Sequence, residues 1–189
     1  MALNWDKYSD KITAIGATVT ALAAISITVI EMRSEQEFQR ISVEPYLEMG
    51  NSGGAPGFDF YRFVISNTGL GPAVIKSFEF YVDDQEVLAW SDALELLTSG
   101  DEEINYSYSS ILPMRRISAE ETLVAVELTP RSPTVVSFHR AMPGDRVKIE
   151  LCYCSVYDDC WQSDFSAAFT EGLHQPVREC PIDEDGFSN

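Results

Sequence analysis

Four cysteines are the residues of this sequence whose type and spacing say most about chemistry. They are Cys152, Cys154, Cys160 and Cys180. Zinc sites usually contain Cys-x2–4-Cys knuckles whose thiolates converge on the metal, and redox centres contain Cys-x-x-Cys at a helix start. The spacing here, Cys-x-Cys-x5-Cys-x19-Cys, matches neither pattern and favours disulfides. Free buried thiols, or a metal site to which His174 contributes, stay open as alternatives.

The expected pairing of these cysteines follows from a hairpin and a tail. Alternation along a strand places Cys152 and Cys154 on the same face, and the acidic pair at 158–159 is typical of a hairpin tip. Such a hairpin brings Cys160 back beside Cys154, while a proline-flanked tail is able to carry Cys180 across the sheet. We therefore predict the bonds Cys154–Cys160 and Cys152–Cys180.

Acidic residues are the other candidate ligands. Asp158, Asp159 and Asp164 offer the oxygen atoms that Ca²⁺ prefers, although a solvated acidic turn is the favoured interpretation. The acidic pairs at 83–84 and 102–103 are interpreted in the same way. We predict no metal site and no cofactor.

Catalysis has little support in the sequence. There are two histidines, His139 and His174, and His139 lies in an alternating stretch that predicts a strand. We expect no nucleophile elbow, and the sequence contains no His-Glu-x-x-His and no Ser-x-x-Lys motif. The chain is therefore not expected to be an enzyme.

The charge of the chain excludes one class of partner. Its formal net charge is −17, with 13 Lys and Arg residues among 189. Nucleic acid is a polyanion whose binding depends on Lys and Arg contacts to phosphate, so a nucleic-acid partner is not expected. The same charge opposes adhesion of the folded domain to an anionic lipid surface.

The elements that position these residues begin with an apolar stretch at 12–30, which carries no charged side chain. At about 1.5 Å per residue, a helix of this length spans the hydrocarbon core of a bilayer. The stretch 1–11 forms a cytoplasmic flank, in which Trp5 and Tyr8 lie where interfacial aromatic residues belong. A cleaved signal peptide and a buried helix of a soluble domain are the alternatives. We predict an uncleaved transmembrane anchor, with the lipid bilayer as its partner.

A strip of small residues follows one side of this predicted anchor. Gly16, Thr20 and Ala24 are spaced four apart, and such strips let helices approach each other closely in a bilayer. The strip is therefore a candidate helix-packing surface, and a lipid-facing helix in a monomer is the alternative.

Beyond the anchor the pattern predicts a helical stalk at 31–44, a domain at 45–180 and an acidic tail at 181–189. Residues 51–57 read as a glycine-rich loop, and Gly69 or Gly71 is expected to adopt positive φ in a tight turn. Residues 90–97 have helical spacing, with Ser91 or Asp92 as cap. Apolar and β-branched runs predict strands at 58–66, 74–87, 122–129, 133–140, 146–156 and 160–169. Short strands separated by turns predict an antiparallel β-sandwich with one short inserted helix.

Several local motifs carry a resemblance. They are Pro-Tyr-Leu at 45–47, Asn-Thr-Gly-Leu-Gly-Pro-Ala at 67–73, Phe-x-Phe-Tyr-Val-Asp-Asp at 78–84 and Tyr-Cys-Ser-Val-Tyr at 153–157. With the N-terminal anchor, this plan resembles uncharacterised bacterial single-pass membrane proteins that have an extracytoplasmic immunoglobulin-like domain. The resemblance implies that fold and a membrane location. It implies no activity and no functional residues.

Disulfides persist outside the cytosol, so the cysteines place the C-terminal domain in the periplasm and the anchor in a bacterial inner membrane. The favoured function is a non-catalytic interaction module, held at the membrane, that binds a partner protein or acts as an accessory subunit. The alternative is an oligomeric membrane effector or channel-like assembly in which the anchor self-associates and carries the activity.

Overall fold

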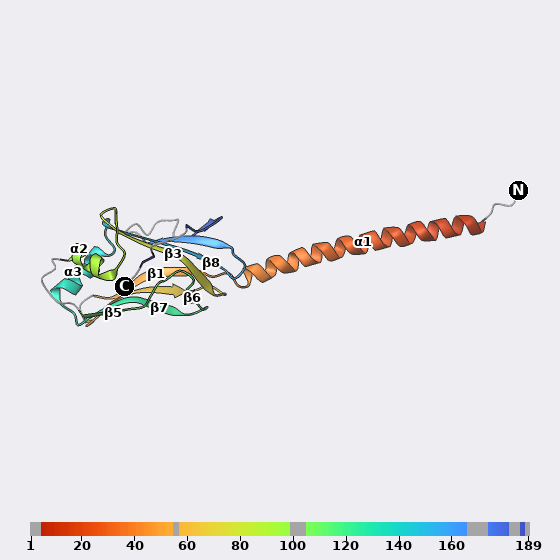
Figure 1. Cartoon of the computed structure of the whole chain (residues 1–189). Coiled ribbons are helices and arrows are strands. Elements are labelled where there is room, and N and C mark those ends of the chain that lie inside the picture. Colours follow the sequence, from red (N-terminus) through yellow and green to blue (C-terminus); the bar gives the residue numbers. More distant parts are fainter. Residues whose placement is uncertain (1–4, 55–56, 99–104, 166–173, 182–185, 188–189) are drawn as a thin grey trace. The chain divides into compact units, whose positions relative to one another are not determined.

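The fold is mainly β, with an N-terminal apolar helix and two antiparallel sheets (Figure 1). The computed structural model describes residues 5–54, 57–98, 105–165, 174–181 and 186–187. The chain divides into two compact units, Met1–Ser42 and Val43–Asn189. The expected acidic pair at 102–103 lies outside the described residues.

Helix α1 (Trp5–Ile41) is one continuous helix of 37 residues. It unites the expected flank, span and most of the stalk, and it ends at Ile41. Its part Ile15–Ile41 is long and apolar enough to cross a membrane, and none of that part is buried. Hydroxyls in the span bond to the helix backbone, as Thr20 does to the carbonyl of Gly16 at 2.8 Å.

Both sheets of the second unit are antiparallel. The first has the order β1-β2-β7-β5 and consists of β1 (Leu47–Gly53), β2 (Tyr61–Asn67), β7 (Thr122–Thr129) and β5 (Asn105–Tyr108). The second has the order β10-β9-β8-β3-β4 and consists of β10 (Gln175–Val177), β9 (Cys160–Phe165), β8 (Val147–Cys154), β3 (Ala73–Val82) and β4 (Gln85–Glu86). The short strand β6 (Arg116–Ile117) pairs with β3. β1 extends through Gly53, so the expected loop at 51–57 begins later than predicted.

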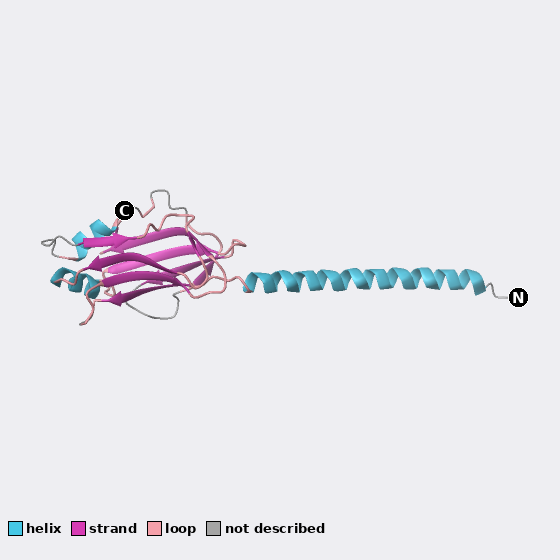
Figure 2. Cartoon of the chain, turned by 90° about the horizontal axis from the view of Figure 1, so that it is seen from below, coloured by secondary structure: helices cyan, strands magenta, loops and turns pink. Residues whose placement is uncertain are grey.

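Two short helices lie at the same end of the sheets (Figure 2). Helix α2 (Trp90–Leu97) confirms the expected helix, but its N-cap is Ala89, which makes no side-chain capping bond. Helix α3 (Pro133–Ala141) replaces a predicted strand. The hydroxyl of Ser132 accepts a hydrogen bond from the Val135 amide at 3.3 Å, and a proline suits the first helical position. These start signals outweigh the β-branched residues behind them.

One hydrophobic core lies between the sheets. Along β2 the residues Tyr61, Phe63 and Ile65 are buried and alternate with less buried neighbours, as period-2 patterning predicts. Trp90 of α2 is fully buried against these sheets. Phe187 packs on Trp90 with ring centroids 5.1 Å apart, so the stretch 181–189, expected to be only an acidic tail, contributes a core residue.

The turn at 67–73 forms for a different reason than predicted. Neither Gly69 nor Gly71 has a positive φ, so that expectation is wrong. Asn67 organises the turn instead: its side-chain oxygen accepts from the amides of Tyr46 and Gly69. Its side-chain nitrogen donates to the carbonyl of Gly71 at 2.8 Å. The backbone of residues 43–46 passes so close that a Cβ on either glycine would overlap it.

Candidate functional site

The hairpin of β8 and β9 forms as the sequence predicted. Cys154 lies directly opposite Cys160 in the strand register, and the two form a disulfide. The Ser155 hydroxyl accepts hydrogen bonds from the amides of Tyr157 and Asp159 and closes the tip. Asp158 adopts φ of 60° there, a conformation that aspartate tolerates better than most residues.

The C-terminal segment is attached to the same hairpin at three points. Cys180 forms a disulfide with Cys152, which is the second predicted pairing. β10 pairs with β9, where Val177 lies opposite Cys160. The third point is His174, which bonds to Tyr153. One disulfide, one strand pairing and one hydrogen bond therefore hold this segment on the second sheet.

We expect the two disulfides to contribute unequally to stability. In the loop-entropy model, replacing Cys152 and Cys180 together by alanine costs about 3.5 kcal/mol, and replacing Cys154 and Cys160 together costs about 2 kcal/mol. The difference arises because the sequence separations are 28 and 6 residues. Urea unfolding of the full chain in detergent, followed by tryptophan fluorescence, measures both values. If both variants lost the same free energy of unfolding, or if removal of Cys154–Cys160 cost more, the explanation by loop length would be contradicted.

The inner face of β8 carries a tyrosine that joins the two sheets. The Tyr153 hydroxyl accepts a hydrogen bond from the Leu47 amide of β1 at 2.9 Å and lies 2.7 Å from His174 Nδ1. The Ser163 hydroxyl donates to the Leu47 carbonyl at 3.2 Å. Burial raises the pKa of Tyr153 to about 12. The hydroxyl is therefore a neutral structural link between β1 and β8.

His174 lies among aromatic rings at this junction. Its ring centroid is 4.4 Å from that of Tyr46 and 5.6 Å from that of Trp161, with which it stacks. Burial lowers the pKa of His174, and the negative charge of Glu44 opposes this shift. Its Nε2 atom is buried and has no hydrogen-bond partner among the described residues. Sequence reasoning considered His174 only as a metal ligand, because nothing in the local pattern connects it to Tyr153.

The stability of the domain is expected to depend on the protonation of His174. Because its folded-state pKa lies below the ordinary 6.5, the unfolded chain binds more protons just below pH 6.5. The stabilisation by His174 is therefore complete above pH 6.5 and is lost as the pH falls through the folded-state pKa. His174→Gln keeps a hydrogen-bonding group and removes this dependence.

Thermal midpoints of parent and His174→Gln, measured from about pH 5 to pH 8, test this dependence. We expect the parent to lose more stability than the variant on the acid side of this range. If the thermal midpoints of the parent and of His174→Gln fell equally with decreasing pH, the assigned direction of the pKa shift would be contradicted.

A groove runs between the two sheets beside this junction. It has a volume of about 340 Å³, and we call it the edge groove. Among its lining residues are Leu47, Met49 and Gly50 of β1, Val64 of β2 and Phe165 of β9. A side chain added at Gly50 would meet no atom within 4 Å. The groove is therefore open above Gly50.

Strand β1 forms one border of the edge groove and is an end strand of its sheet. The Tyr46 carbonyl points to the β2 side and accepts a hydrogen bond from the Thr68 amide. The Leu47 amide points to the other side and donates to the Tyr153 hydroxyl. Alternation then directs the backbone groups of Met49 and Asn51 away from β2. Among the described residues no strand pairs with this side of β1.

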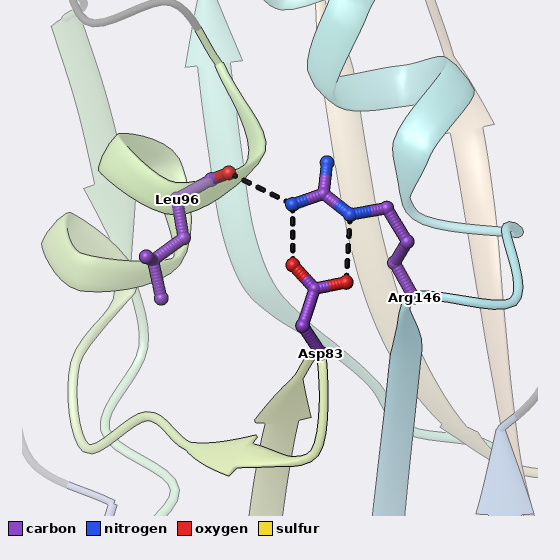
Figure 3. A network of polar contacts seen from close by, with 3 residues as sticks. All are labelled: Asp83, Leu96 and Arg146. Carbon is purple, nitrogen blue, oxygen red and sulfur yellow. Dashed lines mark hydrogen bonds and ion pairs between the residues drawn. The ribbon is translucent and has the colours of Figure 1, made fainter.

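A network of polar contacts joins the β3–β4 turn to α2 and β8 (Figure 3). Arg146 forms two hydrogen bonds to the carboxylate of Asp83, at 2.8 and 2.6 Å, and a third to the Leu96 carbonyl at 3.3 Å. The guanidinium lowers the pKa of Asp83. Asp83 and Asp84 both have positive φ, as the central residues of a tight two-residue hairpin require. This network has a structural role, because its groups satisfy one another.

The fold does not bring together the carboxylates that were considered as candidate Ca²⁺ ligands. Asp158, Asp159 and Asp164 form no ligand group in the part of the chain that the structure describes. The one group found there consists of cysteine sulfurs that form the disulfides. His139 lies on α3 and not on a strand, and its ring is adjacent to Gly54 and Tyr61.

One motif of possible nucleophile type was missed by sequence reasoning. Residues 50–54 read Gly-Asn-Ser-Gly-Gly, which has the Gly-x-Ser-x-Gly form. A nucleophile elbow requires a sharp turn from a strand into a helix. Ser52 instead lies within β1 and is exposed, and a strand follows as the next element. The motif therefore has no elbow geometry.

The candidate anchor residues all lie in α1. Trp5 is its first residue and Tyr8 lies in its first turns, with side chains outside the described set. Gly16, Thr20 and Ala24 are exposed along the helix. Their exposure leaves the helix-packing role as a prediction.

The comparisons with known proteins place the apolar helix and most of the β domain in one family match. No curated protein matches it. One family model, described as a domain of unknown function (DUF8453), matches residues 12–168. The match starts within α1 and extends past β9, so it includes most of the apolar helix and every described strand except β10. The chain therefore belongs to the DUF8453 family.

Proposed function

We propose that this protein is a non-catalytic interaction module, anchored by α1 in a bacterial inner membrane, with its β domain in the periplasm. The edge groove, next to the side of β1 that no described strand pairs with, is the observation that carries this proposal. The partner is a protein that contributes an extended segment. An accessory-subunit role fits the same geometry.

The strand order supports an immunoglobulin-like sandwich. With β4 counted as an extra strand and β6 and β10 set aside, the strands in chain order are β1, β2, β3, β4, β5, β7, β8 and β9. The first sheet then reads first-second-sixth-fifth and the second eighth-seventh-third-fourth. Immunoglobulin-like domains have this arrangement of two antiparallel sheets. The two short helices are insertions in it.

Two features support the location. An exposed apolar helix of this length suits a bilayer span, and disulfides such as Cys152–Cys180 persist in oxidising compartments. The family match unites the helix with the β domain. Together they favour a tethered domain outside the cytosol over a secreted one.

The mode of binding follows from the groups at the edge of β1. Unpaired backbone N–H and C=O groups on an end strand are able to accept an additional strand from a partner. Met49 and Asn51 present such groups. Beside them, Val64 and Phe165 provide an apolar lining for alternate side chains of that strand. The geometry thus suits an extended peptide with small or apolar residues at every second position.

The groove proposal is tested by filling it without disturbing the fold. Gly50→Tyr places a ring in the groove, and no atom within 4 Å opposes its Cβ. Gly50→Ala is the matched control, because a methyl group leaves most of the volume open. Met49→Pro removes the amide that a new strand would need. Each full-length protein is purified in mild detergent from membranes of the source organism, and its circular dichroism is compared with that of the parent.

We expect a protein partner that co-purifies with the parent and with Gly50→Ala, and that is lost from Gly50→Tyr and Met49→Pro while the circular dichroism is unchanged. Retention of the partner by both of these variants would contradict binding at the edge groove. The absence of any partner with the parent would contradict the interaction-module function itself.

A further inference from the structure

Three of the four cysteine sulfurs lie close together, although they belong to two different disulfides. The Sγ atoms of Cys154 and Cys180, which belong to different disulfides, are 3.8 Å apart. The Sγ atoms of Cys154, Cys160 and Cys180 all lie within 4.8 Å of one another. Cys152 is bonded to Cys180 and so adjoins the same group.

This spacing agrees with the geometry of a metal bound by four thiolates. Zinc binds cysteine sulfur at about 2.3 Å in a tetrahedron, so neighbouring sulfurs are about 3.8 Å apart. The contact between Cys154 and Cys180 already has this separation. Conversion to a four-thiolate site requires that each bonded pair opens to the same distance and that the Cys152 sulfur, which lies outside the close group, moves toward it. Cys154 and Cys160 face each other across paired strands, where side chains on one face are close enough to share a ligand.

A cavity with charged side chains adjoins the cysteine sulfurs. The cavity has a volume of about 490 Å³, adjoins Cys154, Cys160 and Cys180, and provides a path for solvent. Lys76 and Arg178 line this cavity. Four thiolates with one divalent cation have a net charge of −2, which nearby cations stabilise. Asp158 and Glu179 also line the cavity, so the two cations and the two anions of its lining balance in formal charge.

We propose that reduction converts the two disulfides into a tetrathiolate site for Zn²⁺, so that a metal replaces the covalent bonds between hairpin and tail. A dithiol supplies two electrons and two protons to each disulfide and is itself oxidised to a disulfide. The four cysteine thiols then release four protons as their thiolates bind Zn²⁺. The spacing of the cysteines did not suggest this site, because its ligands come from a hairpin and a remote tail and not from two knuckles.

The test uses the full chain in mild detergent. The disulfides are reduced with excess dithiothreitol, which is removed by gel filtration without oxygen. Co²⁺ is then added as the probe, because tetrahedral cobalt with thiolate ligands has intense visible absorption bands. We expect one Co²⁺ per reduced chain, its displacement by Zn²⁺, and a thermal midpoint of the reduced protein that rises when Zn²⁺ is bound. The oxidised parent is the control and is expected to bind none.

Two variants separate this site from adventitious thiolate binding. Cys180→Ser removes the tail ligand and Cys160→Ser removes a hairpin ligand, and each is expected to weaken Co²⁺ binding by about tenfold or more. Lys76→Gln tests the charge of the cavity and should weaken binding less than either. The proposal is overturned if the reduced parent shows no tetrahedral cobalt spectrum, whether it is folded or unfolded. It is also overturned if Cys180→Ser binds Co²⁺ as tightly as the parent.

Discussion

Replacing Trp90 by alanine is expected to lower the free energy of unfolding by about 3–5 kcal/mol, the largest effect of any single truncation in this core. The indole is fully buried. It contacts Phe63 of β2, Phe80 of β3 and Phe187 near the C-terminus. Its removal leaves a cavity at the point where both sheets and the C-terminal residues meet, and the aromatic rings around it are unable to close that space fully.

Trp90→Phe is the matched control for this prediction. The indole Nε1 atom is buried without a hydrogen-bond partner in the described part of the chain, so the substitution breaks no polar contact. We expect the control to lose clearly less stability than the alanine variant. Urea unfolding of the full chain in detergent, followed by near-ultraviolet circular dichroism, measures both. A loss below about 1 kcal/mol for Trp90→Ala would show that the indole is not a central core residue.

Replacing Gly71 by valine is expected to cost about 3 kcal/mol, at the upper end of the range for overpacking. A Cβ at this position would overlap the backbone carbonyl of Val43. Relief requires a shift of the chain at 43–46, which the side chain of Asn67 holds through the Tyr46 amide. A flexible side chain could move aside, whereas this backbone segment cannot do so without losing its hydrogen bonds.

Gly50→Val is the control for the glycine prediction. No atom lies within 4 Å of a Cβ at Gly50, and valine suits a strand. We expect this variant to be as stable as the parent or slightly more stable. The same unfolding measurement is applied to both variants. If Gly71→Val has the same free energy of unfolding as the parent, the close approach of the two backbone segments does not constrain this turn.

The sequence predicted those features that depend on neighbours along the chain. An uncharged run of residues 12–30 has no stable state except a helix in an apolar environment or a buried helix, and α1 contains the whole run. The alternation of Tyr61, Phe63 and Ile65 determined which face of β2 is buried. The cysteine pairing was also predictable from the sequence. The hairpin register places Cys154 opposite Cys160, which leaves Cys152 to pair with Cys180.

The local sequence did not determine the secondary structure where strand-favouring residues and helix start signals lie within a few residues of each other. The β-branched residues after Pro133 favoured a strand, yet the serine cap and the proline start a helix. Gly69 and Gly71 are necessary at their positions, but the physical reason differs from the predicted one. A sequence reveals that a glycine is present, and only the path of residues 43–46 shows that the space beside it is occupied.

Contacts between remote segments were decided by the tertiary structure alone. His174 meets Tyr153, Tyr46 and Trp161 because β10 returns along β9, and Phe187 near the C-terminus packs on Trp90 from the middle of the chain. The edge groove exists because β1 ends one sheet while β9 lies across from it in the other. The periodicity of the sequence determined which side chains are buried. The closing of two sheets around one core determined which of them touch.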